Sequence, residues 1–404
     1  MKNEKNYSGY KSFRYLGEGP FSAYEISEEM GWGEVEPYLV PLSAEQKQRV
    51  EAILEQYPFI SLHDHLINLP KNLNEMVAAI KEIRAETAYD ALSKSCLDAV
   101  FDNQSMYFIL GAYARGWKWD DCIFDMGMRM CDLAHQDFVI QCKRVDDILL
   151  AHRQGKIALI PCFEACTMIE NELDRLDILF GLGVRMMGIV YSEANVLGSG
   201  LSEKNDGGLT NFGHQAVKRL NELGMAIDVS HCGDKTSMDV IEASTDPIFI
   251  SHAGARGVWN SQRMKPDDII IACAKKGGMI GIEAAPHTTF SDSSPNHDID
   301  SFFDHFRYCV DLVGIDHVGF GPDTMYGDHS GLHDVLSKGL SMAAFIKKGE
   351  TSLPHVDYVR GLENPTECSH NIVRYLVKEG YSDEEIGKVI GGNALRILRE
   401  VWPS

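Results

Sequence analysis

The amino-acid sequence predicts a (β/α)8 barrel of the α/β class, and three observations support this fold. First, about eight short apolar runs recur along the chain, which is the number of strands that the barrel requires. Second, these runs are continuously apolar and do not alternate, as expected of strands buried on both faces of a parallel sheet. Third, the spacers carry helix patterns, several of which end at a glycine suited to a C-cap. A doubly wound open sheet is the structural alternative.

The elements are expected in a regular order. Residues 1–42 are rich in Gly, Tyr and Glu with weak periodicity, so an irregular extension packed on the barrel is expected there, followed by the barrel domain at 43–404. An amphipathic helix is expected between its cap, Ser43, and Pro58. The strands are expected at residues 58–63, 96–101, 157–164, 184–191, 225–231, 247–252, 277–284 and 316–323. Helices are expected at 214–224, 234–244 and 301–314, and a long loop with an inserted helix from about 327 to 360.

Composition and charge describe a globular protein with an acidic surface. Hydrophobic residues make up 44% of the 404 residues and charged residues 24%, which is typical of a protein with a substantial core. The formal net charge of −21 repels phosphate backbones and anionic lipids, so neither nucleic acid nor a membrane is expected as a partner. The N-terminus lacks the apolar region of a secretory signal, and the ten cysteines lack the spacing of a disulfide scaffold. We therefore expect reduced thiols and a cytoplasmic location.

Polar side chains fall at the carboxyl ends of the predicted strands, which would converge on one mouth of a parallel barrel. His63 and His65 lie two apart on a strand, so both can bind one ion; surface imidazoles around a turn are the alternative. Glu164 closes an apolar strand, where an unpaired carboxylate is costly unless it binds a metal or hydrogen bonds. His231 and His252 each follow an apolar run and a serine, and two such histidines in consecutive strands favour metal binding over satisfied core imidazoles.

Other residues near these positions could take part in the chemistry. Asp323 follows the last strand and could exchange protons with a metal-bound water, although an Asx turn or a helix cap would also use it. Arg263 could hold a substrate carboxylate, and a surface arginine is the alternative. Thiolates of Cys162, Cys166 and Cys232 could bind zinc, but apolar packing is the favoured interpretation.

At these residues the sequence resembles the membrane (renal) dipeptidase family, a branch of the amidohydrolase superfamily of metal-dependent barrel enzymes. The resemblance runs from about residue 58 to 400. Its motifs keep the order and spacing of the family, which makes chance similarity improbable. The most specific stretches are 208–244, 247–256, 262–270, 310–323 and 380–401.

The resemblance implies a metal-dependent hydrolase with two ions, usually zinc. The implied ligands are His63, His65, Glu164, His231 and His252. Glu164 would bridge the ions, the first two histidines would bind one of them, and the last two would bind the other. Two cations would stabilise a bridging hydroxide and the tetrahedral oxyanion together.

The implied activity is hydrolysis of an amide bond next to a free carboxylate, with dipeptides as the default small-molecule substrate. The resemblance further implies that Asp323 handles protons and that Arg263 grips the terminal carboxylate of the substrate. A homodimer is compatible with such a barrel, although no sequence feature fixes an interface.

Two departures from the family pattern leave the substrate open. The family usually has His-x-Asp where this chain has His63 and His65, so the first site is less negative by one charge, with consequences for metal preference. The family also has a histidine where this chain has Tyr191, followed by the retained Ser192 and Asn195. Tyr191 could donate a hydrogen bond to the oxyanion instead, and Tyr191 and Asn195 are candidate substrate-binding residues.

These departures keep two alternatives to a dipeptidase. One is an amidohydrolase that acts on a non-peptide amide, a lactam or an N-acyl amino acid. The other is a catalytically silent barrel that binds a ligand or metal without turnover. The second is disfavoured, because Glu164, His231, His252 and Asp323 are all present.

Overall fold

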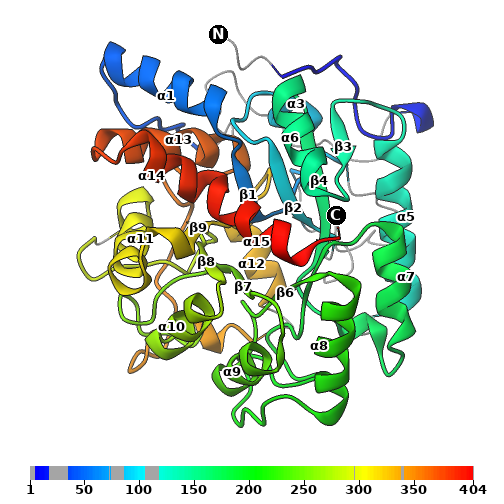
Figure 1. Ribbon diagram of the computed structural model, residues 1–404. Coiled ribbons are helices and arrows are strands. Elements are labelled where there is room, and N and C mark those ends of the chain that lie inside the picture. Colours follow the sequence, from blue (N-terminus) through cyan, green and yellow to red (C-terminus); the bar gives the residue numbers. More distant parts are fainter. Residues whose placement is uncertain are drawn as a thin grey trace.

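A ring of eight parallel strands forms the centre of the molecule (Figure 1). The computed structural model describes residues 5–17, 35–71, 73, 86–104, 118–294, 296–337 and 341–403. Neighbouring strands are hydrogen-bonded in the order β1-β2-β4-β5-β6-β7-β8-β9. Their bounds are β1 (Ile60–Asp64), β2 (Ala99–Asn103), β4 (Ile157–Phe163), β5 (Met186–Gly188), β6 (Ala226–Asp228), β7 (Phe249–Ala253), β8 (Met279–Ile282) and β9 (Val318–Phe320).

The ring closes between the first and the last strand. Just beyond β9, the amide of Asp323 donates to the carbonyl of His63, and the amide of His65 donates to the carbonyl of Thr324, both at 2.9 Å. An open, doubly wound sheet would leave these two edges apart. The predicted (β/α)8 barrel is therefore confirmed, and all eight strands lie where the apolar runs predicted them.

One strand was not predicted. The short strand β3 (Val139–Gln141) pairs in parallel with β4 from outside the ring. Two of its three residues are only partly buried. Such a short, half-exposed segment gives no continuous apolar run that sequence reasoning could detect.

Helices surround the ring (Figure 1). Their bounds are α1 (Ala44–Gln56), α3 (Tyr89–Ser93), α5 (Trp119–Leu133), α6 (Val145–Gln154), α7 (Asp174–Leu182), α8 (Asn211–Leu223), α9 (Asp234–Ala243), α10 (Asp267–Lys275), α11 (Ile299–Val313), α12 (His329–Leu336), α13 (Pro365–Lys378), α14 (Asp383–Gly387) and α15 (Asn393–Val401). Short 3-10 or π turns occur at Arg14–Leu16, Thr167–Ile169, Ile315–His317, Ala343–Phe345 and Lys388–Gly392. Within the described part of the chain, no helix has both the length and the hydropathy needed to cross a bilayer.

The predicted helix boundaries rest on local hydrogen bonds. Ser43 caps α1 in a capping box: its hydroxyl accepts from the amide of Gln46 at 3.2 Å, and its own amide donates to the Gln46 side chain at 3.0 Å. Helix α8 ends at Gly224, whose φ of 67° is in the left-handed region that glycine adopts without strain.

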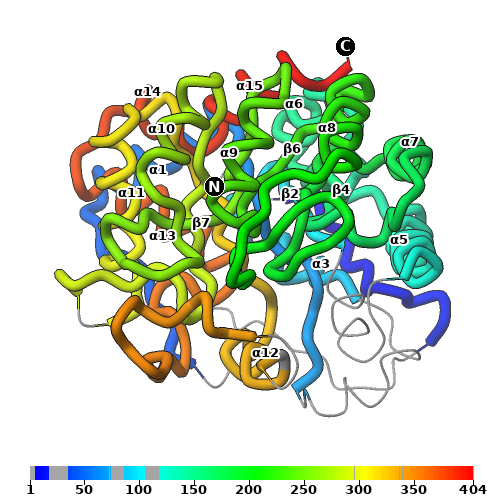
Figure 2. The backbone as a smooth tube through the Cα atoms, turned by 90° about the horizontal axis from the view of Figure 1, so that it is seen from below, coloured from blue at the N-terminus to red at the C-terminus, as the bar shows by residue number. Residues whose placement is uncertain are grey.

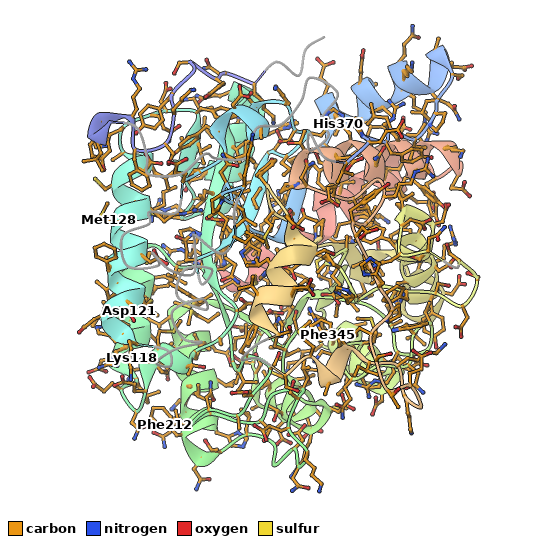
Figure 3. All side chains as sticks on the ribbon, turned by 180° about the vertical axis from the view of Figure 1, so that it is seen from behind. Lys118, Asp121, Met128, Phe212, Phe345 and His370 are labelled. Carbon is orange, nitrogen blue, oxygen red and sulfur yellow. The ribbon has the colours of Figure 1, made fainter. Side chains whose placement is uncertain are left out.

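The two ends of the barrel are covered by different helices. Helix α15 packs on the amino ends of the strands, where its apolar side chains share one cluster with strand residues such as Ile60, Phe101 and Phe249. Helix α12 belongs to the predicted insertion after the last strand and lies on the opposite side of the barrel from α15 (Figures 2 and 3). The carboxyl ends of the strands therefore face α12.

The described parts of the N-terminal extension contact the barrel domain. Lys5 forms an ion pair with Asp98 at 2.8 Å. The hydroxyls of Tyr10 and Ser12 donate to the carboxylate of Asp132 at 2.8 and 2.6 Å. Residues 1–4 and 18–34 of the predicted extension, and residues 338–340 of the predicted insertion, lie outside the described residues.

Candidate metal centre

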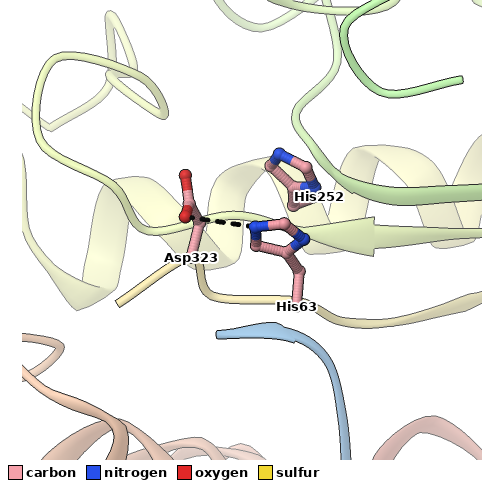
Figure 4. Close-up of side chains that lie close together, drawn as sticks. All are labelled: His63, His252 and Asp323. Carbon is pink, nitrogen blue, oxygen red and sulfur yellow. Dashed lines mark ion pairs between the residues drawn. The ribbon is translucent and has the colours of Figure 1, made fainter. Parts of the chain in front are cut away.

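The structure brings the predicted metal ligands together at the carboxyl ends of the strands. Two clusters of side chains have ligand atoms that all lie within 4.8 Å of one another. The first consists of His63, His252 and Asp323 (Figure 4), and the second of Glu164, His231 and His252. His252 belongs to both clusters, so the two potential sites are adjacent.

The first cluster joins β1 to the segment after β9. His63 Nε2 lies 3.5 Å from Asp323 Oδ1 (Figure 4), and the His63 ring stacks on that of His252 with 3.7 Å between centroids. His65 is in neither three-residue cluster, but its Nε2 lies 3.1 Å from the same Asp323 oxygen. Asp323 is thus the link between the two histidines of β1.

The second cluster is centred on Glu164. Its Oε2 lies 3.2 Å from His231 Nε2 and 3.9 Å from His252 Nε2, and the two histidine nitrogens are 3.0 Å apart. The amide of Asn103, the last residue of β2, donates to the other oxygen of Glu164 at 2.5 Å. Sequence reasoning missed Asn103, although a polar residue two positions after the predicted strand at 96–101 is a signal that could have found it.

The residues present fit divalent metal ions. Both ring nitrogens of His63 and Nδ1 of His65 are buried without a hydrogen-bond partner among the described residues. Buried polar atoms normally find a partner, because leaving one unsatisfied costs free energy. Imidazole nitrogens and carboxylate oxygens in this combination are the donor set that zinc and similar ions use.

The electrostatics suit neutral imidazoles at His63, His231 and His252 and an ionised carboxylate at Asp323. At His65, burial acts to lower the pKa, but the hydrogen bond with Asp323 and the charge of Asp323 outweigh burial and raise it. Burial lowers the pKa of His63 to about 3 and the pKa values of His231 and His252 well below the usual range. Burial alone would raise the pKa of Asp323, but the hydrogen bond with His65 and the neighbouring imidazoles outweigh it and hold that pKa well below its ordinary value. Neutral imidazole is the form that binds metal.

The pKa of Glu164 shifts in the opposite direction to that of Asp323. Burial raises the pKa of its carboxyl group to about 8, although the neighbouring His65 and the hydrogen bond from Asn103 act to lower it. A carboxylate in this position is stabilised by a cation within a few ångströms. The shift therefore agrees with a cation-binding role for Glu164.

Serine side chains orient His252 in β7 and the histidine that follows β6, since Ser192 Oγ lies 3.4 Å from His231 Nδ1. Ser251 Oγ lies 2.8 Å from His252 Nδ1, and Ser230 Oγ donates to Asp228 at 2.7 Å. The amide of Ser251 donates to the same Asp228 oxygen at 2.7 Å. With Nδ1 of His252 engaged in this way, its Nε2 faces Glu164, as expected of groups that orient metal ligands. The sequence showed the two Ser-His pairs but did not reveal the role of Asp228.

Asp323 has an unusual backbone conformation. Its φ of 56° lies in the left-handed region, which is uncommon for residues other than glycine and occurs often at functional sites. The next residue, Thr324, is held by Asp64, whose Oδ1 accepts from the Thr324 amide at 2.8 Å and from its hydroxyl at 2.7 Å. Asp64 was not predicted as a site residue, yet it anchors the segment that carries Asp323.

Tyr191 lies at the same mouth, three residues after β5. Its ring stacks on that of His231 with 4.3 Å between centroids. Burial raises the pKa of its phenol well above the usual value, so the hydroxyl keeps its proton and is able to donate a hydrogen bond.

Asn195 does not have the predicted position of a substrate-binding group. Its amide nitrogen donates to the carbonyl of Ile189 at 2.9 Å and to the hydroxyl of Thr167 at 3.2 Å. Its carbonyl oxygen accepts from the amides of Leu197 and Gly198 at 2.8 and 3.3 Å. All four hydrogen-bonding positions of the side chain are used to shape the loop after β5, so the assignment of Asn195 to substrate binding is corrected to a structural role.

Arg263 is buried and paired, so the alternative of a surface arginine is wrong. Its guanidinium forms an ion pair with Glu283, and its Nη2 also donates to the carbonyl of His252 at 3.0 Å. Glu283 directly follows β8 and was missed by sequence reasoning, although it closes a predicted strand as Glu164 does. The predicted free cation for a substrate carboxylate is therefore already engaged inside the protein.

The three cysteines near the site are packing residues. Cys166 and Cys232 belong to the main apolar core and Cys162 to the cluster at the amino end of the barrel. Burial raises the pKa of all three thiols, that of Cys232 to about 12, so they remain protonated and poor metal ligands. The favoured interpretation, apolar packing, is confirmed.

Comparisons with known proteins identify the family of this chain. The sequence profile of the family described as Membrane dipeptidase (Peptidase family M19) matches residues 47–356. Among curated proteins, Dipeptidase tcpJ of Claviceps purpurea (strain 20.1) is 26% identical over 279 residues, which cover 69% of this chain and 58% of that protein. Dipeptidase 3 of Homo sapiens is 22% identical over 377 residues, which cover 89% of this chain and 68% of that protein. The chain thus spans about three fifths to two thirds of the length of these relatives.

Solved structures share the fold over most of the chain. A crystal structure of an amidohydrolase from Pseudomonas aeruginosa superposes with a TM-score of 0.69 at 24% identity and covers 87% of this chain and 99% of that one. A metallo peptidase from Rhodobacter sphaeroides, solved with a phosphinate mimic of the dipeptide L-Ala-D-Ala, has a TM-score of 0.64 at 20% identity and covers 86% of this chain and 99% of that one. At these identities the likeness shows a common barrel architecture.

Proposed function

Because the chain belongs to the membrane dipeptidase family, we propose that it is a metal-dependent hydrolase that splits dipeptides. The observation that carries this proposal is the convergence of Glu164, His231 and His252, with His63 and Asp323 beside them, at one mouth of the barrel. Both curated relatives are named dipeptidases, which supports the same substrate class. The non-peptide alternative is not favoured by these relatives.

We further propose that the native ions are two zinc ions per chain. His63 and His65 would hold one ion, His231 and His252 the other, and Glu164 would contact both. Zinc prefers this mixture of imidazole and carboxylate donors. When bound, two such ions would polarise the scissile carbonyl and make a water molecule nucleophilic near neutral pH.

Asp323 would move the proton in this reaction. The hydrogen bond with His65 and the neighbouring imidazoles outweigh burial and hold its pKa well below the ordinary value, which favours the carboxylate form. Its Oδ1 lies 3.5 Å from His63 Nε2 and 3.1 Å from His65 Nε2, so it is placed among the proposed ligands of the first ion. An ionised carboxylate there is able to accept a proton from the attacking water and to return it to the leaving amine nitrogen. The side chain is 17% exposed, which leaves it reachable from the mouth.

Tyr191 and Asn103 would support the reaction in different ways. The phenol of Tyr191, stacked on His231, would donate a hydrogen bond to the oxygen that becomes negative during attack. Asn103 would keep one oxygen of Glu164 occupied, so that the other oxygen faces His231 and His252.

The proposal is tested by metal analysis combined with a dipeptidase assay. Purified protein is depleted with a chelator and reloaded with zinc, and hydrolysis of alanylalanine is followed by release of free alanine. We expect about two zinc ions per chain at full activity and loss of turnover on depletion. Turnover that persists after complete metal removal would contradict the proposed function.

A further inference from the structure

Three histidines that are not among the proposed zinc ligands gather where α12 meets the loop after β8. His329 and His333 belong to α12, and His287 lies in the loop between β8 and α11. The rings of His329 and His333 are in edge-to-face contact with 4.7 Å between centroids, and the centroids of His287 and His333 are 5.6 Å apart. We call these three residues the α12 histidine cluster. None of them has a part in the proposed reaction.

Two of these histidines have the spacing of metal ligands on a helix. His329 and His333 are four residues apart in α12, so their side chains lie on the same face, one turn from each other. Two histidines with this spacing bind one ion in the His-Glu-x-x-His motif of zinc enzymes. Helix α12 therefore offers two ligands from its own sequence.

His287 supplies a third imidazole from a different element. Its Nδ1 lies 3.4 Å from Nδ1 of His333. This separation is long for a hydrogen bond. It is close to the distance of about 3.4 Å between two nitrogens that bind one tetrahedral zinc ion through bonds of about 2.0–2.1 Å. The distance therefore suits two ligands of a common ion better than a hydrogen-bonded pair.

The backbone of His287 has an unusual conformation. Its φ of 70° lies in the left-handed region, which is uncommon for residues other than glycine. Asp323 at the metal centre is one of three other described non-glycine residues with a positive φ. Such strained positions gather at active sites and ligand-binding sites. The fold thus holds His287 against α12 at a cost in conformational energy.

The three imidazoles are in the form that binds metal. Burial lowers the pKa of His329 to about 4, lowers that of His333 well below the usual value, and lowers that of His287 as well. Neutral imidazole is the form that binds zinc and similar ions. His333 is only partly buried and its neighbour Asp334 is exposed, so an ion has a short path from solvent to the cluster.

The third ligand requires a rotation of one side chain. Among the described residues, only the two groups at the metal centre have three ligand atoms within 4.8 Å of one another. In the α12 histidine cluster, His287 and His333 already have the spacing of ligands, whereas His329 has to turn about its side-chain bonds to reach the same ion. Such a rotation costs far less free energy than the binding of zinc supplies.

We propose that the α12 histidine cluster is a third metal site, which binds a zinc ion through His287, His329 and His333, with water completing the tetrahedron. The site shares no ligand with the metal centre. Its ion would join α12, in the insertion after the last strand, to the loop after β8, and so hold α12 in place at the mouth of the barrel. The site has no carboxylate ligand, so its ion should bind more weakly than the two ions of the metal centre.

The test counts bound zinc as the zinc concentration rises. Wild-type protein, His333→Gln and His287→Gln are depleted with a chelator, equilibrated with increasing free zinc and analysed for bound metal. We expect the wild type to pass from about two to about three zinc ions per chain above the concentration that gives full activity. Each variant should lack this last ion, because it keeps only two of the three ligands. The two substitutions lie on different elements, so a folding defect in one variant leaves the other to decide.

A matched control removes a histidine elsewhere. His214 is exposed on α8, so His214→Gln should bind as many zinc ions as the wild type. Hydrogen exchange of the α12 amides gives a second measurement. Exchange should slow as the last ion binds to the wild type and to His214→Gln, but not to His333→Gln, because the ion then no longer joins α12 to the loop after β8.

Two results would overturn the inference. One is equal zinc content in the wild type, His333→Gln and His287→Gln at every zinc concentration. The other is loss of more than one ion in both folded variants, which would assign these histidines to the metal centre. Failure of the proposed function is a different result, in which zinc-loaded wild-type protein does not hydrolyse alanylalanine. The difference in zinc content between the wild type and the variants does not depend on turnover.

Discussion

The two ends of the barrel are built from the same eight strands but carry opposite kinds of side chain. At the amino end, the first strand residues pack with α15 in an apolar cluster. At the carboxyl end, histidines and carboxylates gather, and several of their buried atoms lack a hydrogen-bond partner among the described residues. The amino end therefore contributes mainly to stability, whereas the carboxyl end buries polar groups that its chemistry requires, although their burial is unfavourable. Substitutions at the two ends should therefore separate activity from stability.

A substitution at the carboxyl end should change the activity most strongly. Asp323→Asn should lower kcat roughly a hundred- to ten-thousand-fold, because the amide cannot accept and return a proton. Asparagine tolerates the left-handed backbone of this position, so the fold should persist. The measurement is steady-state kinetics on zinc-loaded protein with melting temperature as the control. A loss smaller than about tenfold would remove Asp323 from the mechanism.

The next effect is on stability, at the amino end. Leu398 of α15 is fully buried, and Leu398→Ala should cost about 2–5 kcal/mol in the free energy of unfolding, because it leaves a cavity. Its kcat per folded molecule should stay near that of the wild type. Denaturant unfolding measures the cost, and Glu400→Ala on the exposed face of α15 is the control. A large fall in kcat per folded molecule of Leu398→Ala would show that the amino end contributes to activity as well as to stability.

In the metal-free protein, the stability should depend on pH through a group at the carboxyl end. The folded-state pKa of Glu164 is raised to about 8, so the folded state holds a proton that the unfolded state releases at lower pH. The free energy of unfolding is then highest below the ordinary pKa of a glutamate. It falls as the pH rises from there through the folded-state pKa of about 8. Glu164→Gln should remove a large part of this fall, which unfolding curves between pH 5 and about 8 would measure. An unchanged pH dependence would show that Glu164 does not titrate in this way.

The smallest of these effects is on metal affinity. Asn103→Ala removes the hydrogen bond to Glu164 and should weaken zinc binding about ten- to a hundredfold, as is common for groups that orient a metal ligand. Competition with a chelating dye measures the affinity. Asn221→Ala, which removes a hydrogen bond to Asp246 far along the chain, is the matched control and should leave the affinity unchanged. Equal affinities in the two variants would leave Asn103 without a role at the site.

Sequence reasoning predicted most of the fold and much of the candidate site for one physical reason. Buried parallel strands are apolar along their whole length, so a histidine or glutamate at the end of such a run stands out. Glu164 and His252 were found in this way, and the barrel with them. The proposed zinc ions, the homodimer and the cytoplasmic location stay predictions.

The remaining site residues depend on tertiary contacts that a sequence does not display. Asp64 lies between two proposed ligands in the sequence, but its side chain accepts a hydrogen bond from Thr324. Glu283 contributes to the site because the fold brings it to Arg263. The error at Asn195 has the same origin, since the direction of a side chain in an irregular loop follows no period. Strand ends that carry any polar group, Asn103 included, deserve inspection in similar barrels.

The helix that covers the amino end of the barrel, α15, is synthesised long after the first strand. The first strand begins at Ile60, whereas α15 begins only at Asn393. At the usual pace of translation, on the order of tens of seconds separate their emergence from the ribosome. During that time the apolar interior of the strands lacks its cover, although every proposed metal ligand has already been made. The strands that carry the proposed metal ligands are therefore synthesised before the helix that covers the amino end of the barrel.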